Sequence, residues 1–110
     1  MISRKYKIIN KFIDSETETN KFYVGNENIE NHLLFFNDLD IYINSDDDVE
    51  VTVYESLNGI DYKKTYIFNV AGINAFTEKA YITGDYFYLS VKPINTNATI
   101  NLLIRGLNNG

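Results

Sequence analysis

Hydrophobic and polar residues alternate along several short segments of the chain. Val49, Val51 and Val53 alternate with polar or aromatic residues, which is the period-two pattern of a β-strand that buries one face. The same alternation recurs, loosely in the first case, at residues 4–13, 39–44, 86–92 and 99–105. The pattern predicts that the following side chains face the core: Leu39, Ile41, Ile43, Val49, Val51, Val53, Phe87, Leu89, Val91, Ile100, Leu102 and Ile104.

Asn58 and Gly59 come soon after the valine strand and indicate a hairpin. Both residue types adopt positive φ at low steric cost, so the pair predicts a tight two-residue turn. A second β-rich run, residues 62–70, follows at once and is expected to pair with the first strand in antiparallel fashion. Other segments are expected to form strands (21–24, 33–36, 76–82), a polar loop (14–20) and a polar tail (106–110).

The strands and turns together predict the fold class. About eight short strands at intervals of roughly ten residues, without an amphipathic helix, are typical of an all-β sandwich. We therefore expect a single antiparallel β-sandwich, immunoglobulin-like or jelly-roll in topology. A chain of 110 residues suits one domain. Residues 1–14 are expected to form an N-terminal strand or assembly arm, and residues 15–110 the sandwich itself.

Composition narrows the possible partners. Nine Tyr and seven Phe favour strands, and exposed Tyr is common at protein interfaces. The absence of cysteine removes disulfides and thiol chemistry. A net charge of −5 repels phosphate backbones, so no nucleic-acid partner is expected.

Location is predicted from the apolar segments. No apolar run approaches the roughly 20 residues of a membrane-spanning helix, so no membrane partner is expected. The first residues lack the apolar segment of a signal peptide. The protein is therefore expected to stay inside the producing cell, or to be incorporated into a particle there.

The best metal candidate is the acidic loop Asp46, Asp47 and Asp48. Carboxylates on a tight loop can bind calcium, but the glycine and distal glutamate of an EF-hand are missing. Aspartates also occupy turns because they bond to their own backbone. No metal or cofactor is therefore expected, and a calcium loop remains the alternative to a solvated turn.

No catalytic residues are expected, so the chain is predicted not to be an enzyme. His32 is the only histidine and has no second histidine to join it in a metal site. Glu50 and Glu55 lie on opposite faces of their strand, because their separation is odd. They therefore cannot form the carboxylate pair of a glycosidase.

Outward-facing Tyr residues and the basic N-terminal segment are the interface candidates. Tyr42, Tyr54 and Tyr88 lie opposite the aliphatic core positions of their strands. Such rings can contact another subunit, cover the sheet in cross-strand pairs, or stack against sugar rings. The candidate contact residues are Arg4, Lys5, Lys7, Tyr42, Tyr54 and Tyr88.

Residues 33–106 resemble a known group of viral modules. The strand 51–56 continues into the Asn58–Gly59 turn and the aromatic Tyr62, and strands at 86–91 and 100–106 follow. This order resembles the small β-sandwich modules of tailed-bacteriophage virion proteins. The same hairpin and ending are similar to the second half of discoidin-type carbohydrate- or lipid-binding domains. The chain departs from those domains because it lacks their tryptophan after the turn and their bracketing cysteines.

The resemblance implies a structural, non-catalytic component of a phage or phage-like particle. Such modules serve as capsid decoration, head–tail or tail accessory proteins and act through protein–protein contacts with other virion proteins. We therefore expect a homo-oligomer in the virion, assembled in the host bacterial cytoplasm. The alternative is a carbohydrate-binding module that uses exposed Tyr and a calcium ion at Asp46, Asp47 and Asp48.

Overall fold

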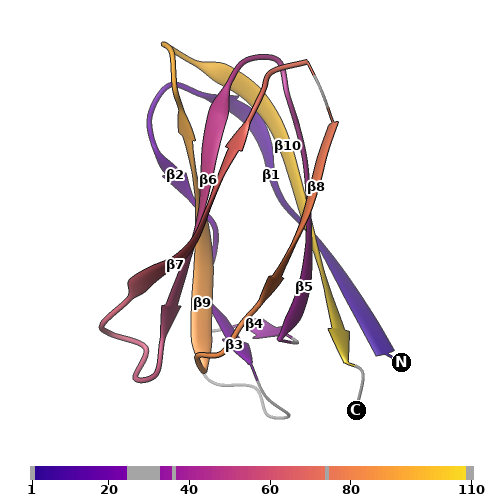
Figure 1. Cartoon of the computed structure of the whole chain (residues 1–110), viewed down its shortest axis with the longest axis vertical. Helices are drawn as coiled ribbons and strands as arrows, with labels where there is room; N and C mark the ends of the chain where they lie inside the picture. Colours follow the sequence, from indigo (N-terminus) through magenta and orange to yellow (C-terminus); the bar gives the residue numbers. More distant parts are fainter. Residues whose placement is uncertain (1, 25–32, 36, 74, 109–110) are drawn as a thin grey trace.

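The computed structural model describes residues 2–24, 33–35, 37–73 and 75–108, with the backbone alone for 2–10, 33–35 and 107–108. These residues form ten β-strands and no helix, so the all-β prediction is confirmed (Figure 1). Accordingly, no helix in this part of the chain is long and apolar enough to cross a membrane.

The strands form two sheets. The four-stranded sheet has the order β1-β10-β5-β8, and the six-stranded sheet has the order β4-β3-β9-β6-β7 with β2 paired to β9. The strands of the first sheet are β1 (Ile2–Ile13), β10 (Ala98–Asn108), β5 (Asp38–Ser45) and β8 (Ala75–Tyr81). Those of the second are β2 (Thr17–Glu18), β3 (Phe22–Val24), β4 (Leu33–Phe35), β6 (Val49–Ser56), β7 (Lys63–Val70) and β9 (Tyr86–Pro93).

The strands pair in a nested order, from the chain ends inward. The first strand, β1, pairs with the last, β10; β3 pairs with β9, β5 with β8, and β6 with β7 at the centre of the sequence. Two further pairings, β10 with β5 and β9 with β6, join these ribbons into sheets. This arrangement is a jelly-roll, which decides between the two topologies that the sequence left open. One pair, β3 with β4, is parallel, which the sequence did not predict.

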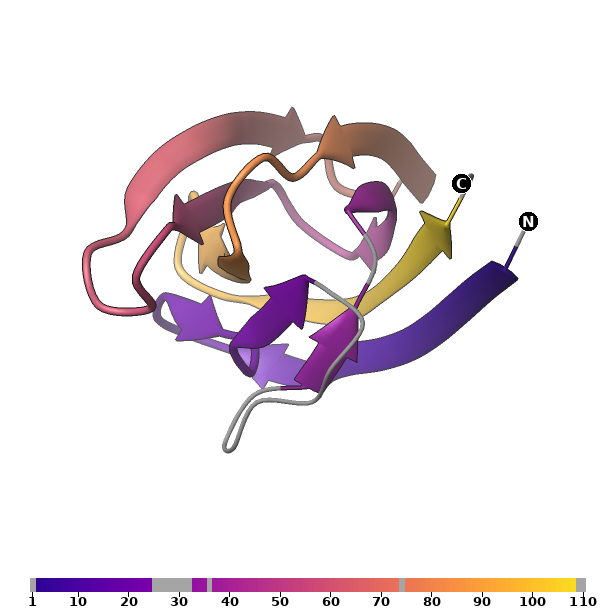
Figure 2. The ribbon, with the colours of Figure 1, turned by 90° about the horizontal axis from the view of Figure 1, so that it is seen from below.

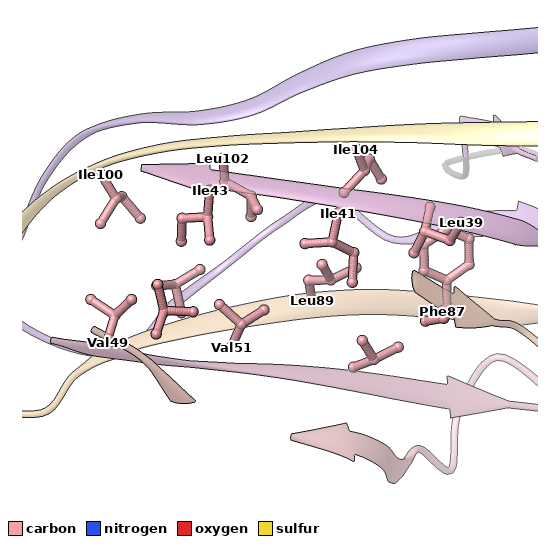
Figure 3. Packing of buried hydrophobic residues seen from close by; sticks show 14 of the residues in the cluster. Leu39, Ile41, Ile43, Val49, Val51, Phe87, Leu89, Ile100, Leu102 and Ile104 are labelled. Carbon is pink, nitrogen blue, oxygen red and sulfur yellow. The ribbon is translucent and has the colours of Figure 1, made fainter. Parts of the chain in front are cut away.

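The core fills the space between the sheets. Figure 3 shows side chains of β5 and β10 pointing toward those of β6 and β9. Every side chain predicted to face the core is at most 1% exposed, because period-two alternation fixes the face of a strand locally. Phe22 adds a stack on Phe87, with ring centroids 4.9 Å apart.

The hairpin between β6 and β7 is wider than predicted. A loop of residues 57–62 replaces the tight turn, and only Gly59 in it has positive φ, at 78°. Side chains hold the loop instead: Ser56 Oγ accepts from the N–H groups of Asn58 and Gly59 at 3.2 and 2.9 Å. Asn58 Oδ1 accepts from the N–H groups of Ile60 and Asp61, both at 2.9 Å. These bonds satisfy the backbone without a second positive-φ residue.

The two ends of the chain also differ from the prediction. The expected polar tail is wrong over residues 106–108, because β10 continues to Asn108 and Gly106 pairs with Leu39 of β5. Residues 2–13 form β1, which runs beside β10 along its whole length (Figures 1 and 2). Within the predicted loop 14–20, two residues form β2 on the edge of β9.

Candidate functional site

Tyr54 and Tyr88 stack on the outer face of the six-stranded sheet. They are direct partners across β6 and β9, with ring centroids 4.8 Å apart and an interplanar angle of 13°. Tyr62, from the β6–β7 loop, meets Tyr88 edge-on at 4.9 Å. Lys21 Nζ lies 5.3 Å from the ring centroid of Tyr62 and 5.7 Å from that of Tyr88. We call these four residues the tyrosine cluster.

Burial changes the chemistry of the tyrosine cluster. It raises the pKa of the Tyr62 phenol, with a smaller contribution from Tyr86. It also raises the pKa of Tyr88, with Glu18 as the next cause. One face of each ring in the Tyr54–Tyr88 stack lies against the other ring. This geometry suits cross-strand cover of the sheet, and the carbohydrate-binding alternative stays a prediction.

Tyr42 belongs to a charged network on the outer face of the other sheet. Asp40 is only 2% exposed and accepts hydrogen bonds from Lys79 Nζ at 2.5 Å and Arg105 Nη2 at 2.9 Å. Arg105 Nη2 also donates to the Tyr42 hydroxyl at 2.9 Å. Burial by itself raises the pKa of Asp40, but the hydrogen bonds from Lys79 and Arg105 outweigh it, and the pKa falls below 3.8.

The interface candidates therefore do not form one surface. Tyr54 and Tyr88 lie together on one sheet, whereas Tyr42 lies on the outer face of the opposite sheet. The backbone of Arg4, Lys5 and Lys7 lies in β1, but their side chains are outside the described part of the structure. His32 also lies outside the described residues.

The carboxylates of the acidic loop each bond to a different part of the structure. Asp46 Oδ1 accepts from Thr99 N–H at 2.7 Å, and Asp48 Oδ1 accepts from Gly72 N–H at 2.8 Å. Asp47 Oδ1 accepts from the N–H group of Asp48 at 2.7 Å and from the side-chain amide of Asn95 at 3.0 Å. They thus tie together the turns at one end of the sandwich. Within the described ranges, no group of three or more metal-ligating side chains could hold an ion.

The sequence did not predict the cavity beside Glu55. This side chain continues the inward face of Val49, Val51 and Val53, and it is only 6% exposed. Its Oε1 accepts from the N–H groups of Thr83 and Gly84 at 2.7 and 2.9 Å and from Thr83 Oγ1 at 3.3 Å. The only signal in the sequence is an acid at an inward position of an apolar alternation.

The cavity lies where the β6–β7 loop meets the turn between β8 and β9. It has a volume of about 520 Å³, within the usual range of ligand pockets. It is lined by Glu55, Ser56, Leu57, Asn58, Asp61, Lys63, Thr65, Thr83 and Gly84. We call it the Glu55 cavity.

Solved structures share this fold, although no protein-family model and no curated protein matches the sequence. The PBSX exported protein XepA superposes with a TM-score of 0.72 at 12% identity, over 99% of this chain and 37% of XepA. PirA superposes with a TM-score of 0.52 at 7% identity, over 96% of this chain and 93% of PirA. The Yersinia pseudotuberculosis-derived mitogen gives 0.49 at 9% identity, over 99% of this chain and 88% of the mitogen. The chain thus spans little more than a third of XepA, and the likenesses to XepA and PirA concern the fold alone.

Proposed function

We propose that the chain is a structural, non-catalytic component of a phage or phage-like particle. Within the particle it would serve as capsid decoration or as a head–tail or tail accessory protein. It would act through contacts with other virion proteins, with its own copies arranged as a homo-oligomer.

The observation that carries the proposal is the fold shared with XepA of the phage PBSX over 99% of this chain. Jelly-roll sandwiches are a recurrent architecture of viral capsid proteins. Because the sequences are only 12% identical, the shared fold supports the class of protein, and the position in the particle rests on the sequence resemblance.

Exposed apolar side chains at both ends of the sandwich support a role in contacts. Leu57 and Ile60, in the β6–β7 loop, are 75% and 80% exposed. Ile73, in the loop between β7 and β8, is 89% exposed and has a φ of 74°, which is unfavourable for a β-branched residue. Its N–H donates to the Ser45 carbonyl at 2.7 Å. Strained residues with exposed side chains are common at binding sites.

Particle purification from the native host tests the proposal. We expect the chain to sediment with intact particles in a density gradient, in a fixed ratio to the major capsid protein. Replacing Leu57 and Ile60 together by serine should lower the amount in particles while the purified variant stays folded. Recovery of the chain only in the medium, free of particles, would contradict the proposal and favour export, as for XepA.

A further inference from the structure

The Glu55 cavity has carboxylate oxygens that accept no hydrogen bond from the described residues. Glu55 makes all its hydrogen bonds through Oε1, and Oε2 has no partner among the described residues. The one buried polar side-chain atom without a partner in this part of the chain is the Tyr62 hydroxyl. Glu55 Oε2 also has no partner there but is not among these buried atoms, so it is in contact with solvent. That solvent is in the cavity that Glu55 lines.

A second carboxylate lines the same cavity. Asp61 Oδ2 accepts from the Asn58 amide at 3.0 Å, and Asp61 Oδ1 has no hydrogen bond within the described ranges. Among the described residues that line the cavity, Lys63 is the one cation, so the lining carries two carboxylates and one ammonium group. The free positions are mostly acceptors, because carboxylate oxygens only accept and the other lining hydroxyls already donate.

A ligand with several donors and a positive charge suits this cavity. A neutral sugar brings as many acceptors as donors and would leave its acceptors with few partners here. A guanidinium or ammonium group brings donors only, and its hydrogen bonds to carboxylates are charge-assisted. Leu57 supplies an apolar wall at the cavity, against which the methylene stem of a long cationic side chain can pack.

We propose that the Glu55 cavity binds the cationic side chain of an arginine or lysine from a partner protein. Glu55 Oε2 and Asp61 Oδ1 accept from the cation, and Leu57 contacts its stem. The exposed Ile60 of the same loop gives the surface around that side chain a second apolar contact. The assignment to a protein partner rests on the proposed function, whereas the binding chemistry of the cavity does not.

Nuclear magnetic resonance of the full 110-residue chain tests the proposal. The N–H groups of Thr83 and Gly84 bond to Glu55 and report directly on the cavity. We expect saturable shifts of both amide signals on titration with N-acetyl-arginine methylamide. N-acetyl-citrulline methylamide has nearly the same shape but no charge, and it should bind at least about tenfold more weakly, the factor of one charge-assisted hydrogen bond.

Variants assign the binding to the two carboxylates. Asp61→Asn and Glu55→Gln should each weaken the binding of capped arginine at least about tenfold. Asp14→Asn makes the same charge change in the segment between β1 and β2. This segment lies at the end of the sandwich opposite the β6–β7 loop (Figure 1), so the variant should leave binding unchanged. If Glu55→Gln does not fold, Asp61→Asn still decides, because Asp61 is exposed and bonds only within its own loop.

Three outcomes would overturn the proposal. They are the absence of saturable shifts at Thr83 and Gly84 with both capped arginine and capped lysine, equal binding of capped citrulline, and unchanged binding in Asp61→Asn. Spermidine binding more tightly than either capped residue would assign the cavity to a free polyamine, against a partner side chain. All of these are measured on the isolated chain, so they are separate from the particle test of the proposed function.

Discussion

The side chain of Tyr66 joins the two sheets at the backbone of Tyr81. Its hydroxyl accepts from Tyr81 N–H at 3.2 Å and donates to the Tyr81 carbonyl at 3.3 Å. Tyr66 lies in β7 and Tyr81 in β8, which are edge strands of different sheets. One hydroxyl therefore both bridges the open side of the sandwich and occupies backbone groups that an edge strand would otherwise present to other chains.

Tyr66→Phe should destabilise the protein. It removes both hydrogen bonds and leaves the Tyr81 N–H and carbonyl to be solvated, so we expect a loss of about 1 to 2 kcal/mol in the free energy of unfolding. Urea denaturation measures the loss, and amide hydrogen exchange at Tyr81 should become faster. Unchanged exchange at Tyr81 would contradict the bridging role.

Tyr62→Phe, in contrast, should stabilise the protein. The Tyr62 hydroxyl is buried without a hydrogen-bond partner among the described residues, and such a group carries an uncompensated desolvation cost. Removing it while keeping the ring on Tyr88 should raise the free energy of unfolding by about 1 kcal/mol. Because both variants are Tyr→Phe, the same urea experiment compares them directly, and a large loss for Tyr62→Phe would reveal a partner for this hydroxyl.

The ion pairs of Asp40 should make the stability of the protein depend on pH. Its folded-state pKa lies below 3.8, so the charged form is favoured in the folded protein. The stabilisation is complete above the unfolded-state pKa of about 3.9 and is lost as the pH falls through the lower folded-state value. Asp40→Asn should cost about 1 to 3 kcal/mol at pH 7.

Urea denaturation at pH 7 and at about pH 2 checks this dependence. The difference between the wild-type chain and Asp40→Asn should shrink at the lower pH, where Asp40 is neutral in the unfolded chain and increasingly so in the folded one. Asp85→Asn, an exposed acid whose side chain makes no hydrogen bond in the described structure, is the matched control. An Asp40→Asn loss of the same size at both pH values would argue against the ion-pair network.

Gly72→Ala should destabilise the end of the sandwich that holds the acidic loop. A Cβ at this position would lie 2.5 Å from Asp47 Cα and 2.7 Å from its carbonyl carbon. Backbone atoms cannot move aside as a side chain can, so we expect a loss of about 1 to 3 kcal/mol. Thr96→Ala, at an exposed turn, should change the thermal midpoint little; equal midpoints for the two variants would contradict the close approach.

The sequence predicted what adjacent residues decide and missed what distant residues decide. The inward faces were predicted correctly because alternation within one strand sets them, as at Leu39, Ile41 and Ile43. The tight turn at Asn58 and Gly59 was wrong because the side chains of Ser56 and Asn58 bond to the loop backbone. Those bonds span only two or three residues, so this turn is an exception: the error lies in local turn chemistry and not in distant contacts.

The candidate sites show the same division. The outward positions of Tyr54 and Tyr88 follow from alternation, but their stacking depends on the register between β6 and β9. Glu55 accepts hydrogen bonds from Thr83 and Gly84. These two residues lie on a turn that comes beside Glu55 only when the strands of the jelly-roll have assembled. The network of Asp40 likewise requires Arg105, which is brought beside it by the pairing of β10 with β5.

The nested strand order has a consequence for how this chain folds. Among the antiparallel pairs of the described strands, only β6 and β7 close a short loop, whereas pairing Ile2 with Asn108 must close a loop of almost the whole chain. The entropy of loop closure grows with the length enclosed, and folds with distant contacts fold slowly. The central hairpin is therefore the natural nucleus, and β1 the last strand to dock. Linking the ends by a short peptide and opening the chain after Asp14 would turn β1 and β10 into a local hairpin, and we expect that permutant to fold faster than the natural order.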